Sequence, residues 1–277
     1  MNKRIIFISA LVITTFLMIS CVSAEGLFDF FANDDANVKN DEKTLIVGFN
    51  SQFPPFGYQD DDRNYTGFDL DLAKEVCKRN NWTYVPQPII DWNSKQMELD
   101  GGEIDCIWSE FTINGREDNY TWSEPYFNNT KVIIVKENST ISSVNDLKGK
   151  NIEIQQGSSF LNTLKNNKTL DDLIGEVTEV DGYDTALMDL ESGVCDAVIC
   201  DSGLGYYKVV EEFNGADLKV LNETISSELY GVAFKKGNTE LRDQVQKTLD
   251  EMFEDGTVDE IAQNYSQYNI PERLIHP

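Results

Sequence analysis

Arg116 is the residue whose type and surroundings point most directly to binding chemistry. It follows a short apolar strand pattern within Gly101–Phe127, GGEIDCIWSEFTINGREDNYTWSEPYF, among threonine, serine and turn-forming residues. Arginine presents a planar fork of N–H donors that holds a carboxylate through two parallel hydrogen bonds. Arg116 is therefore a candidate for binding a small carboxylate, and the rest of the chain must supply the elements that position it.

The usual sets of catalytic and metal-binding residues are missing from the sequence. The single histidine, His276, lies one residue from the C-terminus, so neither a Ser-His-Asp nor a Cys-His nucleophile has a base. There is no CxxC pair, no GxGxxG and no GxxxxGK[ST] phosphate loop. Four cysteines follow the N-terminal region: Cys77, Cys106, Cys195 and Cys200. The sequence predicts no metal and no cofactor.

Composition narrows the class of protein. The chain has 277 residues, of which 40% are hydrophobic, enough for one large or two modest folded domains. Its formal net charge is -25, with 48 acidic against 23 basic residues. Phosphate recognition needs a basic patch, so the charge argues against nucleic-acid binding.

The N-terminal segment resembles an export signal. Lys3 and Arg4 precede the apolar run Ile5–Ile19, and Val22-Ser23-Ala24 offers the small residues that a signal peptidase prefers. We expect a signal peptide at residues 1–24, the alternative being an uncleaved anchor. Cys21 lies in a stretch that resembles a lipoprotein box, so lipidation there is the other route to the membrane. Residues 25–43 are polar around an apolar knot and suit a flexible tether or a disordered remnant.

Strand and helix patterns alternate along the remaining chain, which predicts an α/β fold with mostly parallel sheets. Predicted strands cover Thr44–Phe49, Ile104–Trp108, Val132–Val135, Asn151–Ile154, Glu176–Val180, Ala197–Cys200 and Gly231–Phe234. Predicted helices cover Phe68–Asn80, Asp181–Glu191, Leu204–Glu212 and Leu241–Glu254.

Several ordered motifs resemble the polar amino-acid solute-binding proteins of ABC importers, family 3 of the bacterial extracellular solute-binding proteins. They cover roughly residues 44–268 and are GFDLDLA from Gly67, Thr112 with Arg116, WSEPY from Trp122, QGSS from Gln156, CDAV from Cys195 with Asp201, and GVAFKKG from Gly231. The resemblance implies a two-lobed periplasmic-binding-protein-like clamp with ligand in the crevice between the lobes. One lobe would comprise residues 41–135 plus 229–277, the other residues 136–228, with both crossovers acting as hinge strands.

The same resemblance implies roles for individual residues. Arg116 matches the carboxylate-binding arginine, and Asp201 the partner of the α-ammonium group, with the Thr112 hydroxyl as its helper. Thr112 and Arg116 are four residues apart, whereas five is the more familiar spacing. The further ligand-binding candidates are Asn50, Phe53, Trp92, Trp108, Ser109, Glu110, Ser158 and Ser159.

Two of these candidates point to different ligands. Asn50 stands where members that bind cationic side chains often carry an acid, which favours a neutral polar amino acid. Glu110 stands where a small residue is usual, and it would favour a cation if its carboxylate points into the pocket. Phe53 would pack against the ligand, whereas Trp92 and Trp108 fit the pocket wall and the core equally.

The function implied by the resemblance is an exported, monomeric, non-enzymatic receptor that captures a polar amino acid and presents it to an ABC permease. Its location would be extracytoplasmic, either periplasmic or on the cell surface. The alternative is an enzyme similar to the exported cyclohexadienyl dehydratases, in which Glu110 would act as the acid. A third hypothesis, the sensor domain of a receptor kinase, would need a membrane span and a kinase that this sequence lacks.

Overall fold

The computed structural model describes residues 43–175, 177–213 and 217–277. The expected signal peptide, Cys21 and all of the expected tether except Lys43 lie outside the described residues. In the described part of the chain, no helix combines the length and the apolar character needed to cross a membrane.

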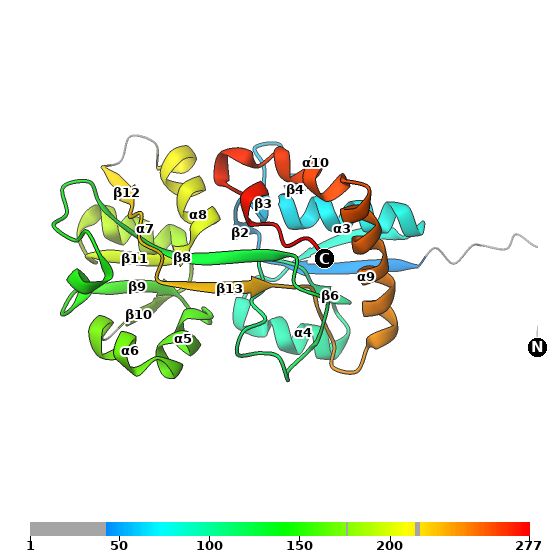
Figure 1. The fold of residues 1–277 in the computed structure, drawn as a ribbon, viewed down its shortest axis with the longest axis horizontal. Coiled ribbons are helices and arrows are strands. Elements are labelled where there is room, and N and C mark those ends of the chain that lie inside the picture. The colour runs from blue at the N-terminus through cyan, green and yellow to red at the C-terminus, as the bar shows by residue number, and fades with distance from the viewer. Residues whose placement is uncertain (1–42, 176, 214–216) are drawn as a thin grey trace, which may run out of the picture. The chain divides into compact units, whose positions relative to one another are not determined.

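The first sheet has five strands in the order β5-β1-β6-β14-β7. β1 runs parallel to β5 and β6, whereas β14 is antiparallel to β6 and β7. The strand bounds are β1 Thr44–Phe49, β5 Thr83–Pro88, β6 Cys106–Ile107, β7 Thr121–Trp122 and β14 Ala233–Phe234. A small separate sheet contains β2 Gln52–Phe53, β3 Gly57–Gln59 and β4 Tyr65–Thr66. The accompanying helices are α3 Phe68–Asn80, α4 Lys95–Gly101, α9 Thr239–Glu254 and α10 Thr257–Gln263 (Figure 1).

The second sheet has six strands in the order β10-β9-β11-β8-β12, with β13 also paired to β8. β9 is parallel to β10 and β11, and every pairing of β8 is antiparallel. The strand bounds are β8 Phe127–Lys136, β9 Ile152–Gln155, β10 Val177–Val180, β11 Ala197–Asp201, β12 Leu218–Val220 and β13 Ser226–Tyr230. Its helices are α5 Phe160–Asn166, α6 Lys168–Ile174, α7 Tyr183–Ser192 and α8 Ser202–Tyr207, which continues as a π-helical turn at Lys208–Glu212. Single 3-10 turns lie at Trp92–Ser94, Val144–Leu147, Ser266–Tyr268 and Pro271–Arg273.

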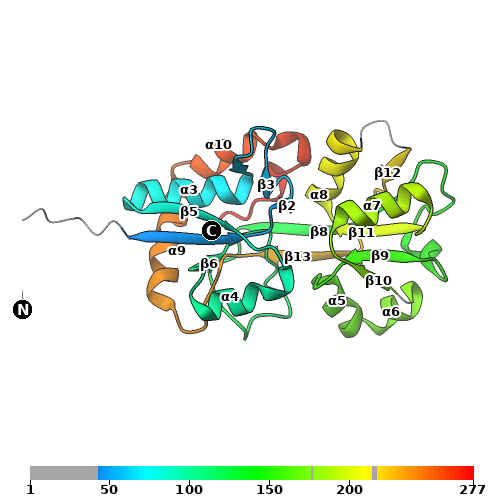
Figure 2. The same ribbon diagram turned by 180° about the vertical axis from the view of Figure 1, so that it is seen from behind.

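Strands β8 and β13 connect the two sheets. They pair from Phe127 with Tyr230 to Lys131 with Ser226, and both run from one group of helices and strands toward the other (Figures 1 and 2). The predicted α/β clamp is confirmed. The expectation of mostly parallel sheets is wrong in one respect, because β8 and β14 run antiparallel to their neighbours and make both sheets mixed. The lobe boundaries expected from the sequence remain a prediction.

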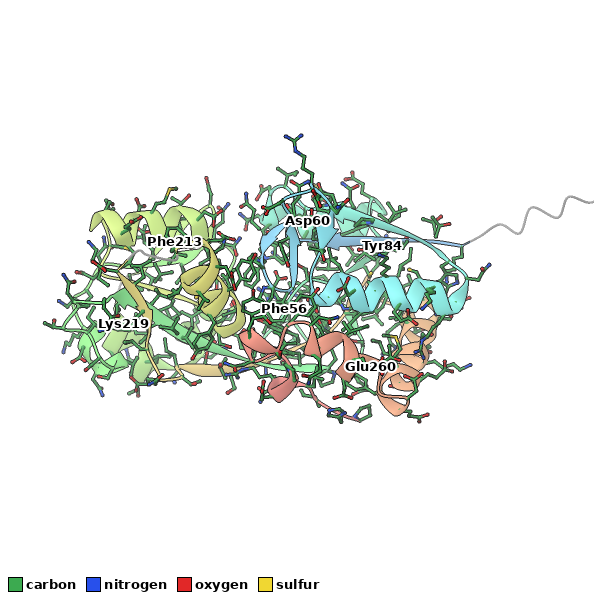
Figure 3. All side chains as sticks on the ribbon, turned by 90° about the horizontal axis from the view of Figure 1, so that it is seen from above. Phe56, Asp60, Tyr84, Phe213, Lys219 and Glu260 are labelled. Atoms are coloured by element: carbon green, nitrogen blue, oxygen red, sulfur yellow. The ribbon has the colours of Figure 1, made fainter. Side chains whose placement is uncertain are left out.

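An aromatic cluster packs where β8 and β13 begin to pair. The ring of Phe127 is stacked on Tyr230 at 5.5 Å, and the edge of Phe56 meets Phe127 at 5.3 Å. Phe68, the first residue of α3, adds a fourth ring 6.1 Å from Phe127. Figure 3 places Phe56 between the part of the molecule that carries Lys219 and the part that carries Tyr84. The four rings are fully buried, and such interiors pack to near-crystalline density. The cluster therefore holds the paired ends of β8 and β13 in place beside the site.

Candidate ligand-binding site

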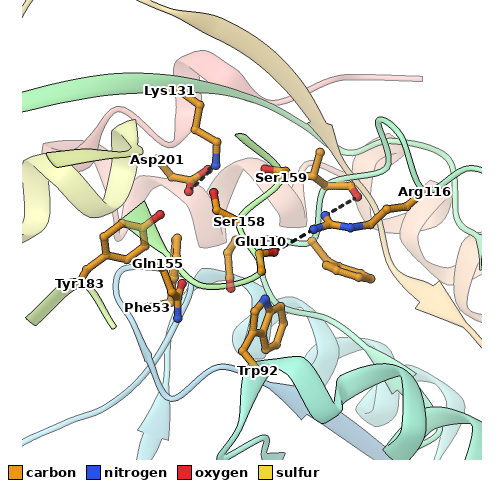
Figure 4. Close-up of a pocket in the computed structure, with 13 residues that line it drawn as sticks. Phe53, Trp92, Glu110, Arg116, Lys131, Gln155, Ser158, Ser159, Tyr183 and Asp201 are labelled. Carbon is orange, nitrogen blue, oxygen red and sulfur yellow. Dashed lines mark hydrogen bonds and ion pairs between the residues drawn. The ribbon is translucent and has the colours of Figure 1, made fainter. Parts of the chain in front are cut away.

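A cavity of about 30 Å³ lies between the elements of the two sheets. Eight predicted site residues line it: Phe53, Trp92, Glu110, Thr112, Arg116, Ser158, Ser159 and Asp201 (Figure 4). Five residues that were not among the predicted site residues complete the lining: Phe111, Lys131, Gln155, Gly157 and Tyr183.

Three predicted residues are placed beside the cavity and not in its wall. Trp108 is fully buried in the core with β6, so it belongs to the packing of the first sheet. The Asn50 side-chain oxygen accepts a hydrogen bond from the backbone N–H of Gln52 at 3.0 Å, which holds a local turn. The Ser109 hydroxyl oxygen accepts from the backbone N–H of Asn50 at 2.9 Å and donates to Glu110. Ser109 therefore connects Asn50 to the cavity through Glu110.

Arg116 projects from a short loop that is fastened to β13. The loop is held by the Ile113 N–H, which donates to the Leu229 carbonyl at 2.8 Å, and by the Leu229 N–H, which donates to Asn114 at 2.8 Å. Gly115 turns the chain with a φ of 77°, where residues with a side chain are strained. These contacts explain why the loop presents Arg116 at a fixed position.

The guanidinium of Arg116 has only carbonyl partners among the described residues. Nη1 donates to the Thr112 carbonyl and Nη2 to the Gly157 carbonyl, each at 3.2 Å, and the group lies 4.9 Å from the centre of the Phe111 ring. No carboxylate of the described residues forms an ion pair with it. Burial lowers the pKa of Arg116 from its usual range, although Glu228 and Asp201 act in the opposite direction. A desolvated cation without a counter-ion favours a bound anion.

Asp201, at the end of β11, is surrounded by donors. Lys131 Nζ donates to Oδ1 at 2.9 Å and to Oδ2 at 2.8 Å, Tyr230 donates its hydroxyl to Oδ1 at 2.5 Å, and the Asn129 amide also donates to Oδ1. Lys131 Nζ also lies 3.4 Å from Glu228 Oε2. Burial disfavours the Lys131 ammonium, but Asp201 and Glu228 outweigh it and hold the pKa of Lys131 above its usual range.

Glu228 accepts hydrogen bonds from two hydroxyl groups that were expected to bind the ligand. Thr112 Oγ1 donates to Glu228 Oε2 at 2.8 Å, and Ser159 Oγ lies 2.9 Å from both carboxylate oxygens. The structure therefore gives the Thr112 hydroxyl to Glu228 and not to Asp201. Ser158, by contrast, accepts from the backbone N–H of Phe160 at 3.3 Å, near the start of α5. Asp201, Lys131, Glu228, Asn129 and Tyr230 are called the Lys131 cluster below.

Glu110 faces the cavity from a strained backbone position. Its φ is 41°, and its backbone N–H donates to Asp69 Oδ2 at 2.5 Å. Asp69 lies in the first turn of α3, is fully buried and also accepts the Tyr126 hydroxyl at 2.7 Å. Burial raises the pKa of Asp69 to about 7, and burial together with Asp69 and Asp201 raises the pKa of Glu110 well above its usual range.

The arrangement is suited to binding a charged ligand. Across the described ranges, no group of three or more His, Cys, Asp or Glu side chains is placed to hold a metal ion. The cavity instead joins an unpaired guanidinium, a lysine-bound carboxylate and two aromatic faces, Phe53 and Tyr183, whose rings meet edge to face at 5.7 Å.

The sequence matches the model of the bacterial extracellular solute-binding proteins, family 3, over residues 45–268. The chain belongs to this family. It is a solute-binding protein, and its named relatives are binding proteins and not enzymes, so the dehydratase alternative is not favoured.

Relatives and solved structures agree with the family over most of the chain. The L-cystine-binding protein TcyJ of Escherichia coli (strain K12) is 29% identical over 252 residues, which is 90% of this chain and 92% of the relative. An ancestral arginine-binding protein bound to arginine is 37% identical, with a TM-score of 0.73, covering 80% of this chain and 97% of that one. The histidine-bound substrate-binding protein of an ABC uptake transporter from Streptococcus pneumoniae is 30% identical, with a TM-score of 0.75, covering 80% and 92%.

Sequence reasoning missed the members of the Lys131 cluster other than Asp201. Lys131 follows Asn128-Asn129-Thr130, so this polar run is typical of a loop, and nothing local in the sequence indicates that Lys131 is buried. Its partner Asp201 is 70 residues away in the chain. The strand pairing of β8 with β11 and β13 brings the two together and is invisible to local patterns.

Proposed function

We propose that this family-3 solute-binding protein captures an α-amino acid in the cavity and delivers it to an ABC permease. The observation that carries the proposal is Arg116, a partly buried guanidinium that lines the cavity and has no carboxylate partner among the described residues. An α-amino acid supplies the missing carboxylate. The relatives, named for binding cystine, arginine and histidine, support the same class of ligand.

The Lys131 cluster is suited to the other charge of the zwitterion. Asp201 Oδ1 receives three donors, but Oδ2 receives only Lys131 and keeps a lone pair for an α-ammonium group. Burial raises the pKa of Asp201, Lys131 acts in the opposite direction and favours its ionised form, and Glu228 balances part of the lysine charge. The cavity thus pairs an acceptor for the ammonium with a donor for the carboxylate, as burial of both charges requires.

Ligand entry requires the lobes to part. A cavity of about 30 Å³ holds one or two water molecules, far less than an amino acid. β8 and β13 are the strands about which residues 41–135 plus 229–277 can rotate relative to residues 136–228. The hydrogen bond from Arg116 to the Gly157 carbonyl joins the two expected lobes across the cavity and must break when they part.

Export and attachment belong to the same proposal. The protein acts outside the cytoplasm as a monomer, delivered by the signal at residues 1–24 and held, where Cys21 is lipidated, by that cysteine. Its strongly negative charge leaves nucleic acid an unsuitable partner.

The test is a screen of purified residues 43–277 by thermal shift and then by calorimetry. The ligands are the protein amino acids, cystine, ornithine and citrulline, with prephenate and arogenate as probes of the dehydratase alternative. We expect one group of amino acids to raise the melting temperature, because a ligand that binds only the native state stabilises it by mass action. Stabilisation by prephenate alone, with turnover, would instead establish the enzyme.

A further inference from the structure

Four charged residues line the cavity among the described residues: Glu110, Arg116, Lys131 and Asp201. The proposed binding of the amino-acid backbone gives a role to each of them except Glu110. Its side chain lines the cavity and the residue is only 8% exposed. One oxygen, Oε2, accepts the Ser109 hydroxyl at 2.5 Å. Among the described residues, no donor reaches Oε1 and no cation forms an ion pair with either oxygen. A buried acid in this position must either remain protonated or receive a cation from outside.

The other charges of the cavity are already balanced. Lys131 faces Asp201 and Glu228, and Arg116 awaits the ligand carboxylate. Two cations and two carboxylates sum to zero, and a zwitterionic backbone leaves that sum unchanged. An ionised Glu110 would therefore add one uncompensated negative charge, which a cationic side chain of the ligand would cancel.

Groups on every neighbouring element influence Glu110. Asp69 on α3 and Asp201 on β11 disfavour its ionised form, whereas Lys131 on β8 favours it. Tyr126 and Tyr230 are close enough to feel its charge, and so is Lys95 at the start of α4. Lys95 donates to the Trp92 carbonyl at 2.8 Å and lies over the Trp92 ring, and burial followed by Arg116 lowers its pKa to about 8. Lys95 is thus the nearby cation whose positive charge is most easily lost, and among the described residues it forms no ion pair with Glu110.

We propose that Glu110 makes this site selective for amino acids with a cationic side chain. The proposal rests on the proposed function, since it concerns the side chain of the same bound amino acid. Asn50 does not oppose it, because the Asn50 amide oxygen is occupied by Gln52 and the side chain does not line the cavity. The Ser109 hydroxyl accepts a hydrogen bond from the Asn50 backbone and donates one to the Glu110 carboxyl. The side chain that reaches the cavity here is therefore the Glu110 acid and not the Asn50 amide.

Binding of a cationic side chain beside Glu110 is linked to the release of a proton from Glu110. In the free protein Glu110 holds a proton over a wide pH range, because burial disfavours its charge. A bound cation favours the carboxylate, so binding releases the proton, and affinity for the cation rises with pH until Glu110 is already ionised in the free protein. A neutral ligand leaves Glu110 protonated and its affinity independent of this group. Lys95 loses its charge near pH 8 and would add a second, separate rise.

Arginine and citrulline form the decisive ligand pair, because they have nearly the same shape and differ in the charge at the end of the side chain. Calorimetry at pH 5.5, 6.5 and 7.5, in two buffers of different ionisation enthalpy, measures affinity and proton release together. We expect arginine to bind at least tenfold more tightly than citrulline at pH 7.5, with proton release at pH 5.5. Glu110→Gln should reduce the arginine advantage to less than threefold and abolish the release.

Glu103→Gln is the matched control, since it removes one exposed negative charge from the same lobe without touching the cavity. It should behave as the wild type, and thermal unfolding should show that both variants are folded. Equal binding of arginine and citrulline by the wild type, or an arginine advantage that survives in Glu110→Gln, would overturn the inference while leaving amino-acid binding intact. Failure to bind any amino acid would overturn the proposed function and this inference with it.

Discussion

At one end of the cavity Arg116 is a partly buried cation without a carboxylate partner among the described residues, whereas at the other end Lys131 is a fully buried cation with two. Both lie on rigid supports, Arg116 on a loop fastened to β13 and Lys131 within β8. Burying an unpaired charge is costly, and burying a paired one costs much less. The unpaired end is therefore expected to contribute mostly to binding, and the paired end mostly to the stability of the fold.

Removal of Lys131 should have the largest effect, and on stability. Lys131→Met leaves Asp201 and Glu228 as neighbouring buried carboxylates without a cation, so we expect a loss of about 3–5 kcal/mol in the free energy of unfolding. Chemical denaturation measures it. Lys168→Met removes an exposed ion pair with Asp172, made at 2.9 Å, and should leave the free energy of unfolding almost unchanged, because water screens the pair. A Lys131→Met protein as stable as Lys168→Met would remove the distinction between the two ends.

Asp69 should give the next largest effect, as a dependence of stability on pH. Its folded pKa of about 7 lies above the value of 3.8 expected in the unfolded chain, mainly through burial. The stability contributed by the protonated group is complete below pH 3.8 and is lost as the pH rises through 7. The loss amounts to roughly 4 kcal/mol at most, at ~1.4 kcal/mol for each unit of pKa.

The comparison that isolates Asp69 is Asp69→Asn, measured by urea denaturation between pH 4 and 7.5. The variant should lose much of the slope that the wild type shows, while Glu110→Gln reports the separate share of the other buried acid with a raised pKa. Parallel pH profiles for wild type and Asp69→Asn would show that the Tyr126 and Glu110 hydrogen bonds keep Asp69 ionised.

Arg116 should matter for affinity and little for folding. Arg116→Ala leaves the ligand carboxylate without its charged partner, which we expect to weaken amino-acid binding by about two to three orders of magnitude, or ~3–4 kcal/mol. The melting temperature of the free protein should change little, because no carboxylate is left behind. Calorimetry measures the affinity. Lys148→Ala is the control, because Lys148 is exposed and its replacement also removes one positive charge. Affinity close to wild type in Arg116→Ala would remove Arg116 from the site.

The two ends of the cavity show which features can be predicted from the sequence and which cannot. The helix Phe68–Asn80 was predicted to the residue, because its apolar spacing is local. Arg116 and Asp201 were selected from motifs and line the cavity. Lys131 and Glu228 were missed because their value depends on the ladder between β8, β11 and β13, whose partners are distant in sequence. Polar residues inside a paired strand look like loop residues until the pairing is known, so β8 was predicted at less than half its length.

Thr112 should give the smallest effect and the sharpest test of how the two ends are divided. The family resemblance assigns its hydroxyl to the ligand ammonium, whereas the structure gives it to Glu228 at 2.8 Å. Thr112→Val keeps the shape but leaves a buried carboxylate with one donor fewer, so stability should fall by about 1–2 kcal/mol. Affinity, corrected for the folded fraction, should change less than threefold, and Thr112→Ser should restore the stability. A stable Thr112→Val protein that binds its amino acid tenfold more weakly would instead assign the hydroxyl to the ligand.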